Sequence, residues 1–212
     1  MKYNKISPNI ITCDNFLPQQ QIDFLYMDFL NNQKRFKTSN WLNEDGSSSE
    51  QFYSPNCGGF DFWNYSWKEF HEDCPSISNI KNWFIHQGLV YFAERNNLQI
   101  FSWLKKKVFF DIHVVAYNHG GYYNWHTDEG KGNVFTFNLI LNKGTNLEGG
   151  NLLFLDGNET IEIENKNNFM VVFPSFIPHA ITPLYAKNKK NVSFAEQRFS
   201  VQYWIKLDRK EE

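Results

Sequence analysis

Two histidines and an aspartate have the types and spacing to bind one metal ion. His126 and Asp128 are two residues apart, and His179 follows further along the chain. Residues two apart in an extended strand, or at its exit, point to the same side, so His126 and Asp128 can approach one cation while Thr127 faces away. Two imidazoles and one carboxylate form a three-point face on non-haem Fe(II) and leave positions open, whereas structural zinc usually takes four protein ligands. The sequence therefore predicts an open Fe(II) site.

His-x-Asp pairs also occur by chance, so the order of the whole set carries the prediction. His179 lies where Pro174 and Pro178 stiffen the path between two strand-like segments. Hydrophobic strand-like runs separate it from His126, and Arg198 follows it. The other four histidines are interpreted as surface or satisfied core residues: His71, His86, His113 and His119.

The segment that Arg198 opens alternates with a period of two. One face, which we expect to pack outward against another layer, carries Phe199, Val201, Tyr203 and Ile205, and the other carries Arg198, Ser200, Gln202 and Trp204. If the second face lines a barrel, the guanidinium of Arg198 is buried and needs an anionic partner. A planar bidentate donor suits a carboxylate. In the alternative, Arg198 stands at the start of the strand and reaches solvent.

These motifs together resemble the Fe(II)/2-oxoglutarate-dependent dioxygenases, in particular the prolyl-4-hydroxylase-like branch. The resemblance covers roughly the C-terminal half of the chain, and a further match precedes the first expected helix at residues 14–18. The matching segments are Tyr117 to Asp128, Phe135 to Asn142, Glu148 to Phe154, Phe173 to His179, and Arg198 to Ser200 with Trp204.

The resemblance implies that His126, Asp128 and His179 hold Fe(II). It also implies that Arg198 binds the distal carboxylate of 2-oxoglutarate, whose 2-oxo acid end chelates the metal, with O₂ as the second co-substrate and ascorbate as a candidate reductant. Ser200, on the same face as Arg198, is expected to assist. Tyr117 begins the motif before the first histidine and is interpreted either as a co-substrate contact or as a core aromatic.

One departure from the family pattern concerns the distance between His179 and Arg198. Eighteen residues, 180–197, separate them, which is more than is usual in this branch. The extra piece includes Lys187, Lys189 and Lys190 and is interpreted as a solvated loop. Either the loop is an insertion that leaves Arg198 in place, which we favour, or one of these lysines binds the carboxylate instead.

Composition suits a single globular enzyme domain, because 212 residues with 42% hydrophobic content can form a proper core. A net charge of -2 predicts no broad attraction to nucleic acid. Cys13, Cys57 and Cys74 form neither a metal-type pair nor a disulfide framework. No apolar stretch has the length of a signal peptide or a membrane span, so we expect a cytoplasmic protein without membrane contact.

Two amphipathic helices are expected in the N-terminal half, near residues 18–31 and 76–94. Between them, residues 36–70 are rich in Ser, Asn and Gly and carry many aromatics from Trp41 to Trp67. This stretch is interpreted either as a lid that grips substrate at the mouth of the site or as an irregular cover on the core.

Strand signals dominate from residue 108, with alternating runs near 108–117, 134–142, 151–155, 160–164, 169–173 and 198–206. They predict a mainly β, α+β fold with a double-stranded β-helix, or cupin-like jelly-roll, core over 108–206. Residues 1–107 are expected to supply helical and loop support, with both helices buttressing a sheet.

The expected function is hydroxylation of a C–H bond by an Fe(II)- and 2-oxoglutarate-dependent oxygenase, on a prolyl or other residue of a peptide or protein. A free amino acid or another small molecule is the alternative substrate, since fold and iron site do not select it. Two other classes stay open: a cupin-like metal enzyme that uses no oxo acid, and a sugar- or metal-binding jelly roll. Neither needs an inward guanidinium on the last strand, so Arg198 discriminates among them.

Overall fold

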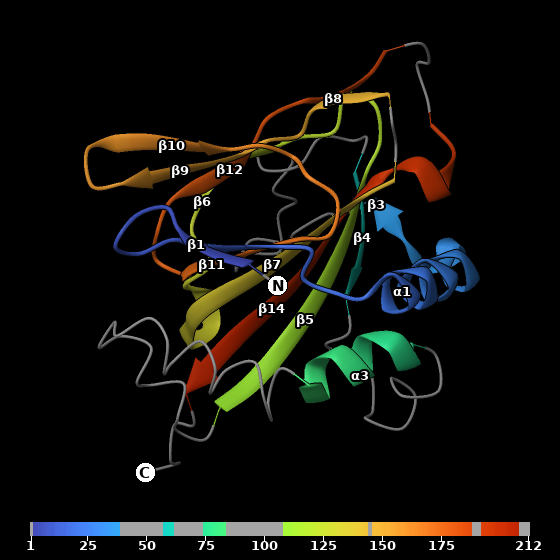
Figure 1. Cartoon of the computed structure of the whole chain (residues 1–212), viewed down its shortest axis with the longest axis horizontal. Helices are drawn as coiled ribbons and strands as arrows, with labels where there is room; N and C mark the ends of the chain where they lie inside the picture. The colour runs from blue at the N-terminus through green and yellow to red at the C-terminus, as the bar shows by residue number, and fades with distance from the viewer. Residues whose placement is uncertain are drawn as a thin grey trace, which may run out of the picture.

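The core consists of two antiparallel sheets that face each other in the computed structural model (Figure 1). Among the described residues, the large sheet has eight strands and the small sheet has four, with a separate pair of short strands beside them. The structure describes residues 2–38, 57–61, 74–83, 108–143, 146–187 and 192–207. The expected double-stranded β-helix is confirmed.

The large sheet has the order β1-β2-β11-β7-β14-β5-β4-β3. Its strands are β1 (Lys2–Lys5), β2 (Ile11–Asp14), β3 (Lys37–Thr38), β4 (Cys57–Asp61), β5 (Val108–Tyr117), β7 (Asn133–Asn142), β11 (Phe169–Pro174) and β14 (Arg198–Leu207). The last strand, β14, lies at the centre of the sheet between β7 and β5. Arg198 therefore does not stand at an exposed edge.

The small sheet has the order β10-β9-β12-β6. Its strands are β6 (Tyr123–His126), β9 (Leu152–Asp156), β10 (Glu159–Ile163) and β12 (His179–Ile181), and the separate pair is β8 (Leu147–Gly149) with β13 (Leu184–Ala186). A turn at Gly157, whose φ is +67°, joins β9 to β10 in a hairpin.

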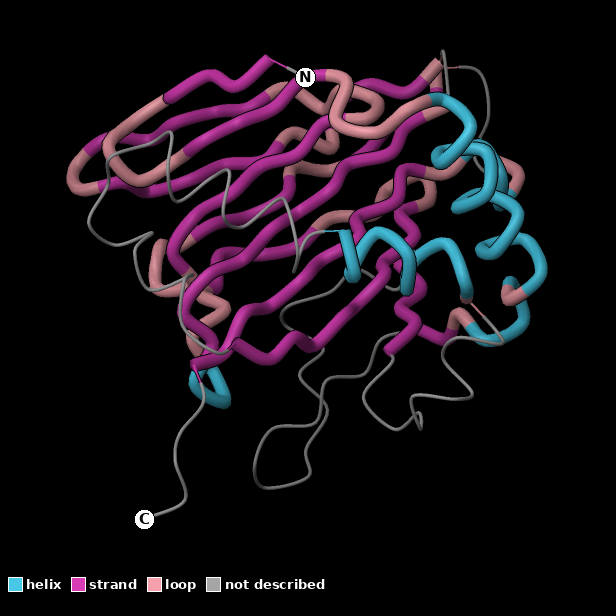
Figure 2. The backbone as a smooth tube through the Cα atoms, turned by 60° about the horizontal axis from the view of Figure 1, so that its bottom comes forward, coloured by secondary structure: helices cyan, strands magenta, loops and turns pink. Residues whose placement is uncertain are grey.

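Two helices, α1 (Gln19–Asn31) and α3 (Pro75–Trp83), lie on one side of the large sheet (Figure 2). Prolines fit both starts, because Pro18 directly precedes α1 and Pro75 opens α3, where a helix needs no N–H donor. On α1 the buried residues Ile22, Leu25 and Phe29 recur at helical spacing. The two helices thus present apolar stripes to the sheet, as the sequence predicted.

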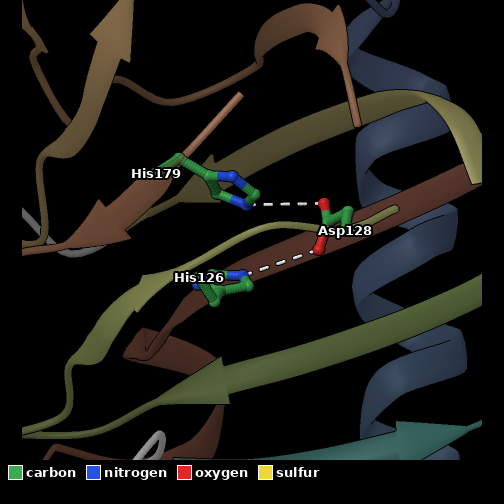
Figure 3. A group of neighbouring side chains, drawn as sticks. All are labelled: His126, Asp128 and His179. Atoms are coloured by element: carbon green, nitrogen blue, oxygen red, sulfur yellow. Dashed lines mark ion pairs between the residues drawn. The ribbon is translucent and has the colours of Figure 1, made fainter. Parts of the chain in front are cut away.

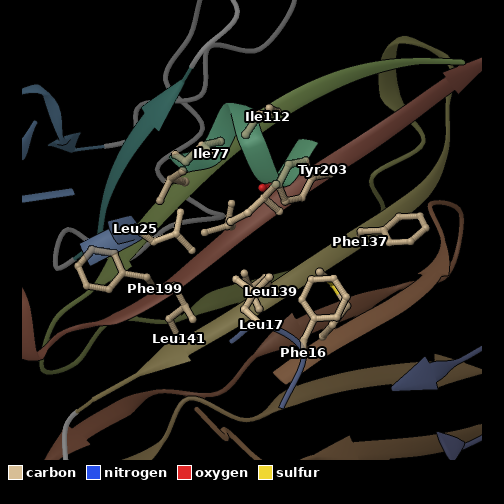
Figure 4. Close-up of a cluster of buried hydrophobic side chains, with 14 of the residues drawn as sticks. Phe16, Leu17, Leu25, Ile77, Ile112, Phe137, Leu139, Leu141, Phe199 and Tyr203 are labelled. Carbon is tan, nitrogen blue, oxygen red and sulfur yellow. The ribbon is translucent and has the colours of Figure 1, made fainter. Parts of the chain in front are cut away.

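The large sheet separates two hydrophobic clusters. The first, between the sheet and the helices, contains the face of β14 that was expected to pack outward, with Phe199, Val201, Tyr203 and Ile205 (Figure 4). The second lies between the two sheets and includes Ile140 of β7 and Phe154 of β9. Arg198, Ser200, Gln202 and Trp204 alternate with the first set, so they face the space between the sheets.

Strands over all six predicted runs from residue 108 onward are present, with ends shifted by one or two residues. Strands β1 to β4 were not predicted; they extend the large sheet at both edges and come from the N-terminal part of the chain. The division at residue 107 stays a prediction. Residues 84–94 of the second expected helix, and most of the stretch 36–70 interpreted as a lid, lie outside the described residues.

Candidate metal centre

His126 and His179 are brought together by strand pairing in the small sheet. They are direct cross-strand partners at the junction of β6 and β12, and their ring centroids lie 4.1 Å apart. The pairing explains how residues far apart in sequence reach one site, because opposite residues of antiparallel strands point to the same face. The spacing of the sequence predicted this convergence but not the pairing that produces it.

A β-bulge in β6 fixes the orientation of His126. Ile181 pairs with Tyr123 while His179 pairs with His126, so β6 has one residue more than β12 between these two pairs. The bulge places Tyr123 and His126 on the same face, where their rings stack with centroids 3.7 Å apart. Phe173 packs edge-on against the ring of His179 at 4.7 Å. Aromatic contacts thus hold both imidazoles in place.

Asp128 follows β6 in a short loop that is tied to the large sheet. Its backbone N–H donates to the carbonyl of Ser175 at 2.8 Å, and its own carbonyl accepts from the side chain of Asn133 at 2.7 Å. The hydroxyl of Thr136 donates to Oδ2 of Asp128 at 2.7 Å, and lies 3.1 Å from the hydroxyl of Ser175. Because the proton of Thr136 points to Asp128, the hydroxyl of Ser175 donates to Thr136.

The three side chains converge as predicted (Figure 3). Nε2 of His126 lies 3.5 Å from Oδ1 of Asp128, and Nε2 of His179 lies 3.4 Å from Oδ2. All three ligand atoms lie within 4.8 Å of one another, and no other group of this kind occurs among the described residues. Asp128 and His179 are buried, and the side chain of His126 is 9% exposed. Three protein ligands on one ion leave further positions open.

A hydrogen bond from Nδ1, the ring nitrogen away from the metal site, fixes the tautomer of each imidazole. Nδ1 of His126 lies 2.8 Å from the carbonyl of Asn124, and Nδ1 of His179 lies 3.0 Å from the carbonyl of Ile177. A carbonyl only accepts, so Nδ1 carries the proton in both rings and the lone pair is on Nε2. Within the described part of the chain, both Nε2 atoms are buried without a hydrogen bond. A divalent metal ion fits these atoms, because it would take the two lone pairs that the protein leaves unused.

The charge states of the site also suit a metal ion. Burial lowers the pKa of His126, and the neighbouring His179 lowers it further, so the ring is neutral near pH 7. Burial alone would raise the pKa of Asp128, but the interactions with His179 and His126 outweigh it and hold this pKa well below its usual range. An ionised carboxylate and a neutral imidazole are the forms of Asp128 and His126 that bind metal.

Arg198 is fully buried in the space between the sheets, at 0% exposure. Its Nη1 donates to the hydroxyl of Ser200 at 2.8 Å, and its guanidinium lies 4.9 Å from the ring centroid of Tyr117. The predicted inward guanidinium is therefore present, and the alternative in which Arg198 reaches solvent is wrong. Ser200 and Tyr117, also fully buried, are its immediate neighbours, so the predicted co-substrate residues gather at one place.

The absence of a side chain at Gly150 leaves room for the aliphatic part of the Arg198 side chain, called its stem below. A Cβ on Gly150 would lie 3.0 Å from Cδ of Arg198 and 2.8 Å from a methyl carbon of Leu184. A side chain on the neighbouring Gly149 would overlap the carbonyl oxygen of Pro183 at 2.2 Å. Both glycines have positive φ. The two glycines of the motif Glu148-Gly149-Gly150 are thus explained by close packing against Pro183, Leu184 and the aliphatic part of Arg198.

Lys187 does not take the place of Arg198. It is half exposed and pairs with Glu148 at 2.8 Å on the surface. Lys189 and Lys190 lie outside the described residues. The segment 180–197 nevertheless leaves Arg198 on β14, which agrees with an insertion.

Two of the remaining histidines are described, whereas His71 and His86 lie outside the described residues. His113 is fully buried and stacks on Trp204, with centroids 5.6 Å apart. His119 accepts a hydrogen bond from the backbone of Ala186 at 3.1 Å. Both lie outside the metal cluster.

Comparison with protein families decides the assignment of the core. The model of the 2OG-Fe(II) oxygenase superfamily matches residues 112–206, a range that includes all three candidate ligands and Arg198. This segment belongs to the 2OG-Fe(II) oxygenase superfamily. The match supports Fe(II) and 2-oxoglutarate as the cofactor and co-substrate, and the candidate ligands fit iron. No curated protein matches the chain.

Solved structures share the fold of this oxygenase at low identity. A prolyl hydroxylase from Trichoplax adhaerens, in complex with a hypoxia inducible factor peptide fragment, has a TM-score of 0.68 at 17% identity over 94% of this chain and 84% of that one. A prolyl-4-hydroxylase from Pseudomonas putida has a TM-score of 0.58 at 14% identity over 94% and 93%. The viral collagen prolyl hydroxylase vCPH from Paramecium Bursaria Chlorella virus-1, as a 2OG complex, has 0.57 at 15% over 94% and 97%.

A surface pocket of about 330 Å³ lies beside the metal centre without belonging to it. Its lining includes Trp125, Leu153 and Ala180. Leu153 and Ala180 are the strand neighbours of Phe154 and His179, which face the space between the sheets, so the pocket opens on the outer face of the small sheet.

No helix among the described residues is long and apolar enough to cross a membrane.

Proposed function

We propose that this oxygenase hydroxylates a C–H bond of a peptide or protein, with a prolyl residue as the first candidate. The observation that carries the oxygenase part is the convergence of His126, Asp128 and His179 in the same space between the sheets that holds the buried Arg198. The substrate part is supported by the likeness in fold to prolyl hydroxylases, one of them solved with a peptide.

In this proposal His126, Asp128 and His179 hold Fe(II). A bound Fe(II) ion, with 2-oxoglutarate and O₂, would supply the oxidant for hydroxylation of a C–H bond, with succinate and CO₂ as the other products. Arg198, with Ser200 beside it, binds the distal carboxylate and so orients the oxo acid. The two sheets and their aromatic side chains exclude water from the reacting atoms. Ascorbate is proposed as the reductant that returns the iron to Fe(II).

The first test asks whether 2-oxoglutarate is consumed. Purified protein with Fe(II) and ascorbate should form succinate, and formation should rise when the right proline-containing peptide is added from a panel that also contains free proline and other amino acids. If succinate formation rises only with free amino acids, the substrate is a small molecule and not a peptide. No binding or turnover of 2-oxoglutarate would favour a metal jelly roll of another class.

A second test addresses the ligands. His179→Ala should lose stoichiometric Fe(II) binding and turnover while remaining folded, because two ligands cannot replace the three-point face. Arg198→Met should lower the affinity for 2-oxoglutarate by about tenfold or more, because it removes a charge-assisted pair worth roughly 1.5–3 kcal/mol. Lys187→Met is the matched control and should leave this affinity unchanged. Full iron binding by His179→Ala would show that the third ligand is another residue.

A further inference from the structure

A row of buried amides crosses the inner face of the large sheet between the metal centre and Arg198. Asn138 of β7 and Gln202 of β14 are cross-strand partners, 1% and 2% exposed. Their neighbours along β7 and β14 belong to the first hydrophobic cluster, between the large sheet and the helices. Because side chains alternate along a strand, Asn138 and Gln202 face the space between the sheets. Their oxygens Oδ1 and Oε1 are buried without a hydrogen bond from any described residue. Such groups cost free energy unless a ligand or water satisfies them.

The register of β14 places this row relative to the two ends of the site. Along the inner face, Ser200 pairs with Ile140, Gln202 with Asn138, and Trp204 with Thr136, so successive rows lie about 7 Å apart. The guanidinium of Arg198 is bonded to Ser200, one row to one side of the amides. Thr136, which is bonded to Asp128, lies one row to the other side.

A ligand that joins the two ends must therefore cross the amide row. 2-Oxoglutarate carries a carboxylate on Arg198 at one end and an oxo acid on the metal at the other. Arg198 and Ser200 already supply donors for the distal carboxylate. The oxo acid end brings a second carboxylate into the buried space, and its oxygens need donors of their own. Rotation of a carboxamide exchanges its oxygen and nitrogen, so Asn138 and Gln202 can each present an N–H.

We infer that Asn138 and Gln202 donate hydrogen bonds to the oxo acid end of 2-oxoglutarate, while Arg198 binds the distal end. The inference rests on the proposed function. It divides the recognition of one ligand between two sets of residues, and this division can be measured with a ligand that has only one of the two ends.

The experiment measures equilibrium binding by calorimetry to the full chain loaded with Mn(II), which does not require turnover. The ligands are 2-oxoglutarate and 2-oxopentanoate, which keeps the oxo acid but lacks the distal carboxylate. Asn138→Leu and Gln202→Met, which keep size and remove the amide, should each weaken both ligands by about the same factor, roughly tenfold. Arg198→Met should weaken 2-oxoglutarate alone. Leu139→Met, on the other face of β7, is the matched control and should change neither.

Each outcome has one meaning. If the parent binds 2-oxoglutarate and both amide variants bind the two ligands unchanged, the inference is wrong while the proposed function stands. If the amide variants weaken binding of 2-oxoglutarate alone, the amides bind the distal carboxylate, and the inference is also wrong. If the parent binds neither ligand, the proposed function itself fails. Thermal unfolding checks each variant, and Gln202→Met decides alone if Asn138→Leu does not fold.

Discussion

The metal ligands are held by contacts on the side away from the ligand atoms. The two histidines donate from Nδ1 to backbone carbonyls, and the carboxylate of Asp128 accepts from Thr136. Thr136 in turn accepts from Ser175, so a chain of two buried hydroxyls orients the carboxylate. Hydrogen bonds of this kind prevent rotation of the ligand and hold it ready for the ion.

Thr136→Val should therefore weaken metal binding without unfolding the protein. Valine keeps the shape of threonine but cannot donate to Oδ2 of Asp128, and loss of such a contact typically costs 10- to 100-fold in metal affinity, so we expect a loss of about that order. The dissociation constant for Mn(II) or Fe(II), measured by competition with a chelator, checks this. Thr12→Val, a buried threonine of β2 in the same sheet, is the control. Equal losses in both variants would show a general effect on the fold.

Single residues were predictable where their type restricts their chemistry. His126, Asp128, His179 and Arg198 stand out because few side chains bind iron or a buried carboxylate, and the period of two placed Arg198 inside. Thr136 has no such signal, because a threonine in a strand is ordinary. Its role depends on which loop packs against it in the fold. The register of strands far apart in the sequence determines that contact.

At the scale of elements, the turn that follows β8 determines the position of Arg198. Gly149 and Gly150 adopt positive φ and pack against β13 and the stem of Arg198. The contact joins a turn in the middle of the domain to the first residue of the last strand. A side chain at Gly150 would displace the arginine, the leucine beside it, or both.

Gly150→Ala should lower both stability and 2-oxoglutarate affinity, while Gly157→Ala should lower stability alone. Both positions have a φ of +67°, so alanine costs about 1–2 kcal/mol at each. Only at Gly150 would the added Cβ meet Arg198; at Gly157 nothing lies within 4 Å. Chemical denaturation and calorimetric titration with 2-oxoglutarate measure the two effects. Equal affinities in the two variants would show that the stem of Arg198 can give way without loss.

The elements found from sequence are the long, regular ones. β7 and β14, with ten residues each, alternate clearly and were predicted. β6 and β12 have four and three residues, too few for a period to show, and a bulge interrupts the alternation of β6. The two strands that carry the histidines were therefore hard to predict, although the histidines themselves were not.

At the scale of the whole molecule, the two faces of the large sheet have different roles: one packs against the helices and the other forms the site. One face packs on α1 and α3 and is apolar (Figure 4). The other face carries the arginine, the amides and the hydroxyls of the site. Because alternate residues of one strand serve the two faces, packing on the helical side sets the position of β14 and thus of Arg198. Phe199, the neighbour of Arg198, stacks on Phe29 of α1 with centroids 4.8 Å apart.

Phe29→Ala should destabilise the fold much more than Phe24→Ala on the same helix. Phe29 is 1% exposed and its loss should cost about 3–5 kcal/mol, whereas Phe24 is 47% exposed and its loss should cost less than about 0.5 kcal/mol. For a chain of this size, Phe29→Ala should lower the Tm by roughly 6–20 °C, and differential scanning calorimetry measures the shift. Well below its Tm this variant should still bind Mn(II), because the three ligands lie on the other side of the sheet. If both variants unfold at the parent's temperature, the helices contribute little to the fold, and the inner face must be held by contacts between the two sheets alone.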